Sequence, residues 1–194
     1  MVGKRIFLAL PLEPVEPAVE KIKQLQKLLP AYHIRWVRIE NIHLTLFFFG
    51  EIPLQQIPLL QELLRSSMKN SSAFTFSLTE PGIFKKGKEP RVLWLGIQTP
   101  DQLFDLKKKI NQAVATLGFL PDDIAFHPHL TLGRFLPRQE VSSVLDSALK
   151  DAQLSVPIGY YVSKLILFES KLFPTGPQYY PIEVFPLMPE VPIM

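Results

Sequence analysis

The sequence of 194 residues contains no cysteine, and this absence excludes two kinds of structural support. Without thiols the chain forms no disulfide bond and no thiolate metal site of the zinc-finger type. Glycine is also scarce, with nine glycines against 19 prolines, so stiff connections and sharply ended helices and strands are expected. A reducing compartment is consistent with the lack of cysteine, although it is not required by it.

Long hydrophobic runs are missing as well. No stretch approaches the ~18 apolar residues that a membrane-spanning helix needs. The apolar run at residues 6–10 is shorter than the ~7–15 residues of a signal-peptide core, and Pro11 ends it. We therefore expect a soluble, cytoplasmic protein without a membrane partner. Hydrophobic residues still make up 47% of the chain, which is enough for a real core.

Charge of one sign is not strongly in excess. The net charge is +3, and the longest basic run is Lys107, Lys108 and Lys109. This bias tolerates an anionic partner without demonstrating one. The sequence also lacks the glycine-rich phosphate loop of nucleotide triphosphatases and the dinucleotide-binding fingerprint. Neither of these common nucleotide sites is therefore expected, and no cofactor is predicted.

Hydrophobic periodicity predicts four helices interleaved with strands. The helices are expected at residues 14–29, 55–68, 102–117 and 140–149. The strands are expected at residues 4–10, 42–49, 74–78, 91–97, 129–135, 164–169 and 179–185, with a short strand or extended segment at residues 34–39 and a polar loop at residues 81–90. The connections allow antiparallel pairing, so we expect an α+β fold in which residues 1–194 form a single domain with two similar lobes.

The sequence His-Leu-Thr-Leu occurs twice, beginning at His43 and again at His129. Side chains alternate between the two faces of a strand. His43, Thr45 and Phe47 are therefore expected on one face of the first copy. In the second copy, His129 and Thr131 are expected to share a face. Each copy would present an imidazole beside a hydroxyl, with its leucines anchored in a core.

Two histidines and two threonines suit the cleavage of a phosphodiester without a metal. Near neutral pH one imidazole can act as the base and the other, when charged, as the acid. Threonine hydroxyls can bind the non-bridging phosphate oxygens, and Arg134 would add a fixed positive charge. Strict alternation places Arg134 on the face opposite His129. A bulge at Gly133 would re-aim it toward the site, and otherwise Arg134 is a surface charge.

Two further residues have open roles. His127 either contacts the substrate phosphate or simply holds the loop before the second motif. Phe47 is predicted either to line the cleft and stack on a base or to pack in the core. A zinc site that uses His127 and His129 is a rival hypothesis, but Pro128 separates them and no carboxylate pair is evident nearby. We therefore predict no metal site.

The paired His-x-Thr motifs resemble those of the two-histidine phosphoesterases. The similarity is greatest to the RNA 2′,3′-cyclic phosphodiesterases, also called 2′-5′ RNA ligases. It extends over most of the chain, through the stretches RIFLAL, RWVRIENIHLTLFFFGE, PRVLWLGI, FHPHLTLGR, LILFESKL and YYPIEVFPL. This resemblance implies a bilobal α+β fold, in which two lobes, each with an antiparallel sheet and helices, are related by a pseudo-twofold axis around a central cleft.

The same resemblance implies metal-independent opening of a terminal 2′,3′-cyclic phosphate of RNA to leave a 2′-phosphate. His43 would be the general acid toward the 3′ leaving oxygen, and His129 the general base on water. Thr45, Thr131 and Arg134 would hold the phosphate. The alternatives are a reversible 2′-5′ RNA ligase, a phosphodiesterase for small cyclic nucleotides, and an RNA-end-binding protein without catalysis. The partner is expected to be an RNA end, and the protein a monomer.

Overall fold

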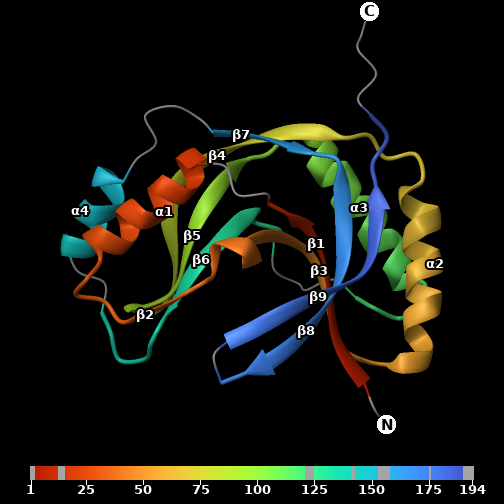
Figure 1. Cartoon of the computed structure of the whole chain (residues 1–194), viewed down its shortest axis with the longest axis horizontal. Helices are drawn as coiled ribbons and strands as arrows, with labels where there is room; N and C mark the ends of the chain where they lie inside the picture. The colour runs from red at the N-terminus through yellow and green to blue at the C-terminus, as the bar shows by residue number, and fades with distance from the viewer. Residues whose placement is uncertain are drawn as a thin grey trace, which may run out of the picture.

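The computed structural model describes residues 3–12, 16–120, 125–140, 143–152, 158–174 and 176–189. Within these residues the chain forms two antiparallel sheets with helices packed around them, as Figure 1 shows, so the predicted α+β class is confirmed. The first sheet has the strand order β3 (His43–Pro53), β1 (Gly3–Pro11), β8 (Lys164–Phe173) and β9 (Gly176–Pro186). The second has the order β2 (Ile34–Trp36), β6 (His129–Phe135), β5 (Glu89–Gln98), β4 (Phe74–Lys86) and β7 (Ile158–Val162).

Two of the helices connect the sheets, because each follows a strand of one sheet and lies beside the other sheet. Helices α1 (Glu16–Leu28) and α4 (Ser143–Asp151) lie beside the second sheet, and α2 (Ile57–Met68) and α3 (Asp101–Ala115) lie beside the first (Figure 1). Yet α1 follows β1 of the first sheet, and α3 follows β5 of the second. Helix α1, from the first half of the chain, therefore lies beside the second sheet, and α3, from the second half, lies beside the first sheet. No helix of the described ranges is both long and apolar enough to cross a bilayer.

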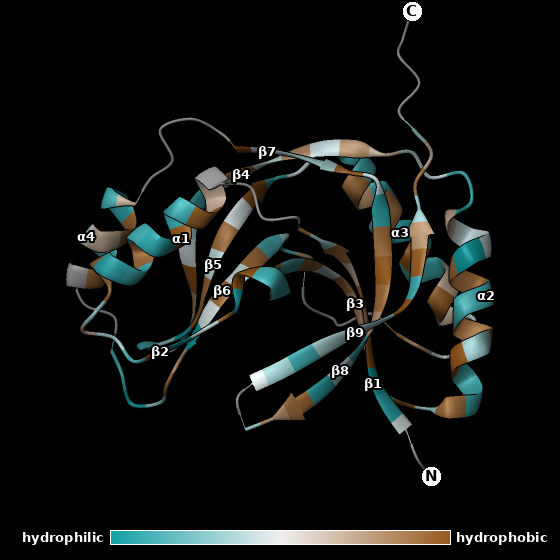
Figure 2. Ribbon diagram, viewed as in Figure 1, coloured by the Kyte–Doolittle hydropathy of each residue, from teal (hydrophilic) through white to brown (hydrophobic). Residues whose placement is uncertain are grey.

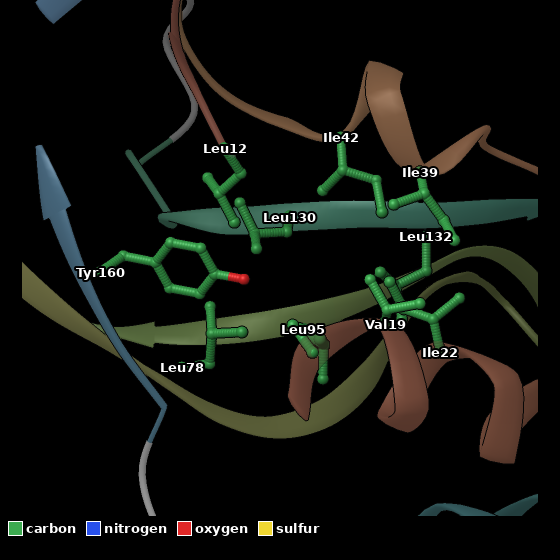
Figure 3. Close-up of a pocket in the computed structure, with 11 residues that line it drawn as sticks. Leu12, Val19, Ile22, Ile39, Ile42, Leu78, Leu95, Leu130, Leu132 and Tyr160 are labelled. Atoms are coloured by element: carbon green, nitrogen blue, oxygen red, sulfur yellow. The ribbon is translucent and has the colours of Figure 1, made fainter. Parts of the chain in front are cut away.

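The motif strands are anchored in the core by their leucines. In Figure 2 the helices alternate brown and teal residues, as expected of amphipathic helices that bury one face. Leu130 and Leu132 are almost completely buried, and with Val19 and Ile22 of α1 they line a small apolar cavity of about 20 Å³ (Figure 3). Leu44 and Leu46 of the first motif are buried in the same way. The prediction that these leucines face a core is confirmed.

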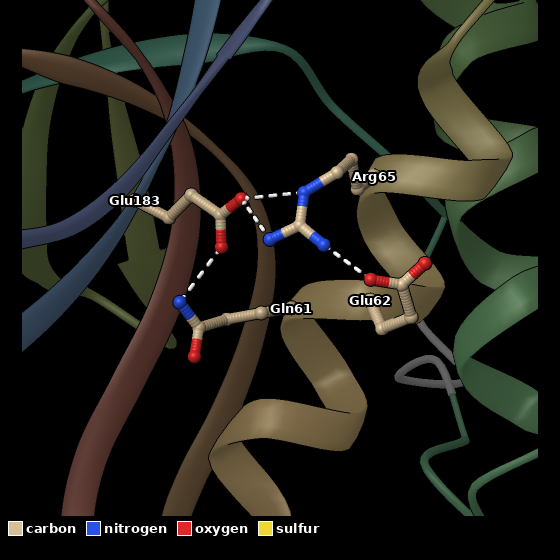
Figure 4. Close-up of polar contacts among 4 residues, drawn as sticks. All are labelled: Gln61, Glu62, Arg65 and Glu183. Carbon is tan, nitrogen blue, oxygen red and sulfur yellow. Dashed lines mark hydrogen bonds and ion pairs between the residues drawn. The ribbon is translucent and has the colours of Figure 1, made fainter.

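A polar cluster connects α2 to β9 (Figure 4). The guanidinium group of Arg65 binds a carboxylate oxygen of Glu183 at 2.7 Å, and Gln61 donates a hydrogen bond of 2.7 Å to the other oxygen. Arg65 also pairs with Glu62 one turn earlier on the helix. These contacts link the side of α2 to β9, and solvent screening weakens the ion pairs because the Arg65 side chain is exposed.

The structure corrects several predicted boundaries. Residues 81–90 are not a loop, because β4 and β5 continue as a hairpin that turns at Gly87, where φ is 61°. The charged residues of this segment, Lys85, Lys86, Lys88 and Glu89, gather around the turn at Gly87, and the sequence pattern did not separate such a hairpin end from a loop. Strand β7 was not predicted at all. Within residues 34–39, predicted as a short strand or extended segment, the strand ends at Trp36 and a 3₁₀ turn follows at Ile39–Asn41.

Candidate active site

The two motifs lie on strands of different sheets that meet at one cleft. Strands β3 and β6 contact each other, and the cleft beside them has a volume of about 590 Å³. The cleft is lined by four of the five residues predicted to do the chemistry, namely His43, Thr45, Thr131 and Arg134. Its walls also include the β8–β9 hairpin, through Ser170, Leu172, Gly176, Pro177 and Tyr179. The tertiary structure therefore brings together the two halves of the predicted site.

Arg134 reaches the cleft because β6 contains a bulge. In the pairing of β6 with β5, Thr131 lies opposite Trp94 and Gly133 lies opposite Leu93, so Leu132 is an extra residue. One extra residue reverses the alternation of side chains. Arg134 therefore lies on the same face as Thr131 and lines the cleft. The predicted bulge is confirmed, with Leu132 and Gly133 as its centre.

A matching bulge in β3 changes the prediction for Phe47. Thr45 lies opposite Ala9 and Phe47 lies opposite Leu8, so Leu46 is the extra residue in this strand. Phe47 is consequently buried in the core, and the prediction that it shares the face of His43 is wrong. Phe48 takes its place in the cleft wall. The alternative of core packing for Phe47 is the one found.

The bulges make Phe48 the positional counterpart of Arg134, five residues after the histidine in each motif. A cation is nevertheless present on this side. The guanidinium carbon of Arg5, from β1, lies 4.4 Å from the centre of the Phe48 ring. Arg5 also lines the cleft. The first sheet therefore supplies its positive charge from a neighbouring strand, whereas the second supplies it from the motif itself.

His43 is held by its own backbone. Its Nδ1 lies 2.7 Å from the carbonyl oxygen of Asn41, two residues earlier. Because a carbonyl oxygen only accepts hydrogen bonds, Nδ1 carries the hydrogen and the lone pair of the neutral ring is on Nε2. The rings of Phe7 and Tyr179 pack against the imidazole, with centroid distances of 4.9 and 5.3 Å. The orientation and tautomer of His43 are therefore set before any ligand binds.

His129 is held by the same arrangement. Its Nδ1 lies 2.7 Å from the carbonyl oxygen of His127, again two residues earlier. The ring of Phe84 packs edge-on against it at 4.8 Å, and Trp94 lies farther away at 6.4 Å. His129 shares a strand face with Thr131, although it is not among the described side chains that line the cleft. The two imidazoles thus have matched backbone contacts and matched aromatic surroundings.

Burial lowers the pKa of both histidines below the ordinary value. For His43, the hydrogen bond to Asn41 raises the pKa in part, and the nearby charge of His129 lowers it further. For His129, the hydrogen bond to the carbonyl of His127 raises the pKa in part, and the charges of His127 and Arg134 lower it. The two imidazoles are close enough to affect each other electrostatically. In the free protein both are mostly neutral at pH 7.

The sequence patterns did not identify Arg5, Arg35, Arg38 and Tyr179 as cleft residues. Burial raises the pKa of the Tyr179 phenol, while the charges of Arg134 and Arg5 lower it in part. The phenol is therefore a protonated hydrogen-bond donor near both guanidinium groups. These residues lie in stretches that carry the family resemblance, but neither alternation nor spacing distinguishes them from surface residues.

The side chain of His127 is exposed and packs against Trp94 and Phe84, with centroid distances of 5.1 and 5.4 Å. It is not among the described side chains that line the cleft. Its main contact with the site is the carbonyl that holds His129. Among the residues that the structure describes, no three His, Asp or Glu side chains gather in a group that could hold a metal ion.

The fold is that of known phosphoesterases. The crystal structure of TT0787 from Thermus thermophilus superposes with a TM-score of 0.79 at 26% identity, covering 96% of this chain and all of that one. Escherichia coli LigT in complex with 3′-AMP superposes with a TM-score of 0.71 at 26% identity, covering 96% of this chain and 99% of that one. A crystal structure described as a phosphoesterase superposes with a TM-score of 0.70 at 25% identity, covering 96% of this chain and 99% of that one, so the two sheets define a phosphoesterase fold.

The sequence comparisons identify the family. The model described as the 2′-5′ RNA ligase superfamily matches residues 11–171, and the chain belongs to this family. An RNA 2′,3′-cyclic phosphodiesterase of Thermotoga maritima is 33% identical over 177 residues, covering 90% of this chain and 91% of that protein. One from Methanothermobacter thermautotrophicus is 32% identical, covering 94% and 98%. The family predicted from the paired motif is confirmed.

Proposed function

We propose that this protein hydrolyses the terminal 2′,3′-cyclic phosphate of RNA and leaves a 2′-phosphate. The two curated relatives described above, both RNA 2′,3′-cyclic phosphodiesterases by name, support an enzyme of this activity. One observation of the structure carries the proposal. Each motif histidine keeps its Nδ1–H on the backbone carbonyl two residues earlier, at 2.7 Å, so both use Nε2 for proton transfer.

In the proposed reaction, His129 is the base and His43 is the acid. A water molecule attacks the phosphorus atom while Nε2 of His129 accepts its proton. The bond from phosphorus to the 3′ oxygen breaks, and the Nε2–H of protonated His43 donates a proton to this oxygen. The phosphate remains on the 2′ oxygen. The reverse reaction exchanges the two roles.

The phosphate would be held by groups of both lobes. Thr45 and Thr131 line the cleft on β3 and β6, where their hydroxyls can donate hydrogen bonds to the non-bridging oxygens. Arg134 adds a fixed charge beside Thr131. Negative charge on these oxygens grows as the fifth bond to phosphorus forms, so donors already in place stabilise the transition state. Tyr179, protonated and near Arg134 and Arg5, is a further donor on the opposite wall.

The direct test uses a short RNA that ends in a 2′,3′-cyclic phosphate, with EDTA present. We expect complete conversion to an RNA with a 2′-phosphate. The product is identified by its sensitivity to phosphatase and by comparison with 2′- and 3′-phosphate standards. Formation of a 3′-phosphate would contradict the assignment of the 3′ oxygen as the leaving group, and absence of any product would overturn the proposed reaction.

The dependence of the reaction on pH follows from the lowered pKa values. The active form of the free protein has one charged and one neutral histidine. Because both pKa values lie below 6.5, kcat/KM is expected to be bell-shaped with a maximum below pH 6.5. The bound phosphate raises the pKa of the acid, so the optimum of kcat should lie at a higher pH than that of kcat/KM. If kcat/KM instead increased with pH and reached a plateau at pH 8, a protonated histidine would be excluded as the acid of the reaction.

A further inference from the structure

Arg35 lies directly opposite Arg134 in the pairing of β2 with β6. Both side chains are exposed, and both line the cleft. Like charges that face each other across two strands are destabilising. A pair of this kind in a catalytic cleft therefore needs a reason other than stability of the sheet.

No carboxylate relieves this repulsion in the part of the chain that the structure describes. Arg35, Arg38 and Arg134 form no ion pair with any described residue, and the described lining of the cleft contains no Asp or Glu. With Arg5, four guanidinium groups thus face one cavity of about 590 Å³. This charge exceeds what a single phosphate monoanion would neutralise.

The backbone is built to bring Arg35 to this place. A side chain on Gly133 would meet the Cγ2 atom of Ile34 at 2.5 Å and the carbonyl of Arg35 at 3.3 Å. Glycine at this position is what allows β2 to lie so close to the motif strand. Charged residues on edge strands also prevent aggregation, and β2 is an edge strand. That role requires a charge on β2, but it does not require one that faces a second arginine within the cleft.

We propose that Arg35, assisted by Arg38, binds a second phosphate of the substrate, the one on the 5′ oxygen of the terminal ribose. This inference rests on the proposed function, in which Arg134 binds the cyclic phosphate. In an RNA chain the 5′ phosphate is the linkage to the preceding nucleotide. A guanidinium group binds such an anion through two parallel hydrogen bonds. The subsite makes the enzyme select an RNA end over a nucleoside 2′,3′-cyclic phosphate.

The test compares two small substrates that differ only in this group, adenosine 2′,3′-cyclic phosphate and its 5′-phosphorylated form. For the unmodified protein, kcat/KM should be at least about tenfold higher for the 5′-phosphorylated substrate. Arg35→Ala should lower this ratio about tenfold, Arg38→Ala less, and Arg35→Lys should retain part of it. Lys109→Ala is the matched control, because it removes one positive charge from the exposed face of α3. It should keep the ratio of the unmodified protein.

Binding of the product analogues gives an independent measurement. Adenosine 2′-monophosphate and adenosine 2′,5′-bisphosphate are titrated while tryptophan fluorescence is followed, to which Trp36 in the lining of the cleft contributes. The bisphosphate should bind at least about tenfold more tightly, and Arg35→Ala should remove most of this preference. Arg35→Ala should also reduce the dependence of bisphosphate affinity on salt concentration, because one phosphate contact is lost.

The outcomes separate the two proposals. Equal kcat/KM and equal affinity for the two members of each pair would overturn the 5′-phosphate subsite. A loss caused by Arg35→Ala that is the same for both substrates would also overturn it, because Arg35 would then act through Arg134 or the fold. Absence of hydrolysis together with an Arg35-dependent preference for the bisphosphate would refute the proposed reaction and leave the subsite supported.

Discussion

Replacement of His43 or His129 by alanine is expected to lower kcat/KM for an RNA 2′,3′-cyclic phosphate by about 10²–10⁴-fold. This is the contribution that a positioned acid or base typically makes. The expectation is the same for both residues because their surroundings match, with the same backbone contact at 2.7 Å and aromatic rings against each imidazole. The rates are measured with EDTA present, on proteins whose thermal unfolding temperatures have been compared.

The double variant separates a catalytic pair from two independent contributions. If proton transfer to water and from the leaving oxygen is concerted, removing both histidines should cost little more than removing the more important one. His33→Ala is the matched control, since this histidine is exposed and lies outside the described lining of the cleft. It should retain activity within about twofold. A single variant of the pair that keeps full activity would show that its motif is only a scaffold.

Replacement of Arg134 by alanine is expected to have the next largest effect, about 10²–10³-fold on kcat/KM, comparable with the loss of one oxyanion donor. The bulge at Leu132 aims this guanidinium group into the cleft beside Thr131. Arg134→Lys should recover only part of the loss, because an ammonium group supplies the charge without the planar pair of donors. The measurement is steady-state hydrolysis of the 5′-phosphorylated cyclic nucleotide.

Arg91→Ala is the control for this series. Arg91 lies on β5 outside the described lining of the cleft and pairs with Glu89, where both side chains are 40% exposed. The substitution changes the net charge as Arg134→Ala does, so activity within about twofold of the unmodified protein is expected. If Arg91→Ala and Arg134→Ala reduce kcat/KM equally, the effect of Arg134 is a general one of net charge, and its role at the phosphate is refuted.

The motif strands show where prediction from the sequence succeeds and where it fails. The alternation of His, Leu and Thr was predicted correctly in both copies, because it depends only on the two-residue period of an extended chain. It fails after Leu46 and Leu132, where each strand has one extra residue relative to its neighbour. In the second copy, Gly133 indicated where a bulge could form. Nothing in the first copy indicated that Phe48, and not Phe47, would face the cleft.

The β4–β5 hairpin was missed for a related reason. Exposed strands of a hairpin carry polar residues, and segment 81–90 therefore resembles a loop when it is considered alone. Pairing with the neighbouring strand makes it extended, and the Trp94 ring then occupies the space that a side chain on Gly82 would need. This contact places the indole in the aromatic wall of His129. The sequence contains Gly82 and Trp94, but it does not show that these two residues are in contact.

The sequence by itself determined the fold class and the family, and it predicted the pair of histidines, because these are carried by local patterns that repeat within the chain. Only the tertiary structure decided which other polar side chains line the cleft. Arg5, Arg35 and Tyr179 come from three separate strands, and they reach the cleft through the register in which these strands pair with their neighbours. Register depends on contacts between residues far apart in the chain, so a reading of one segment at a time does not reveal it.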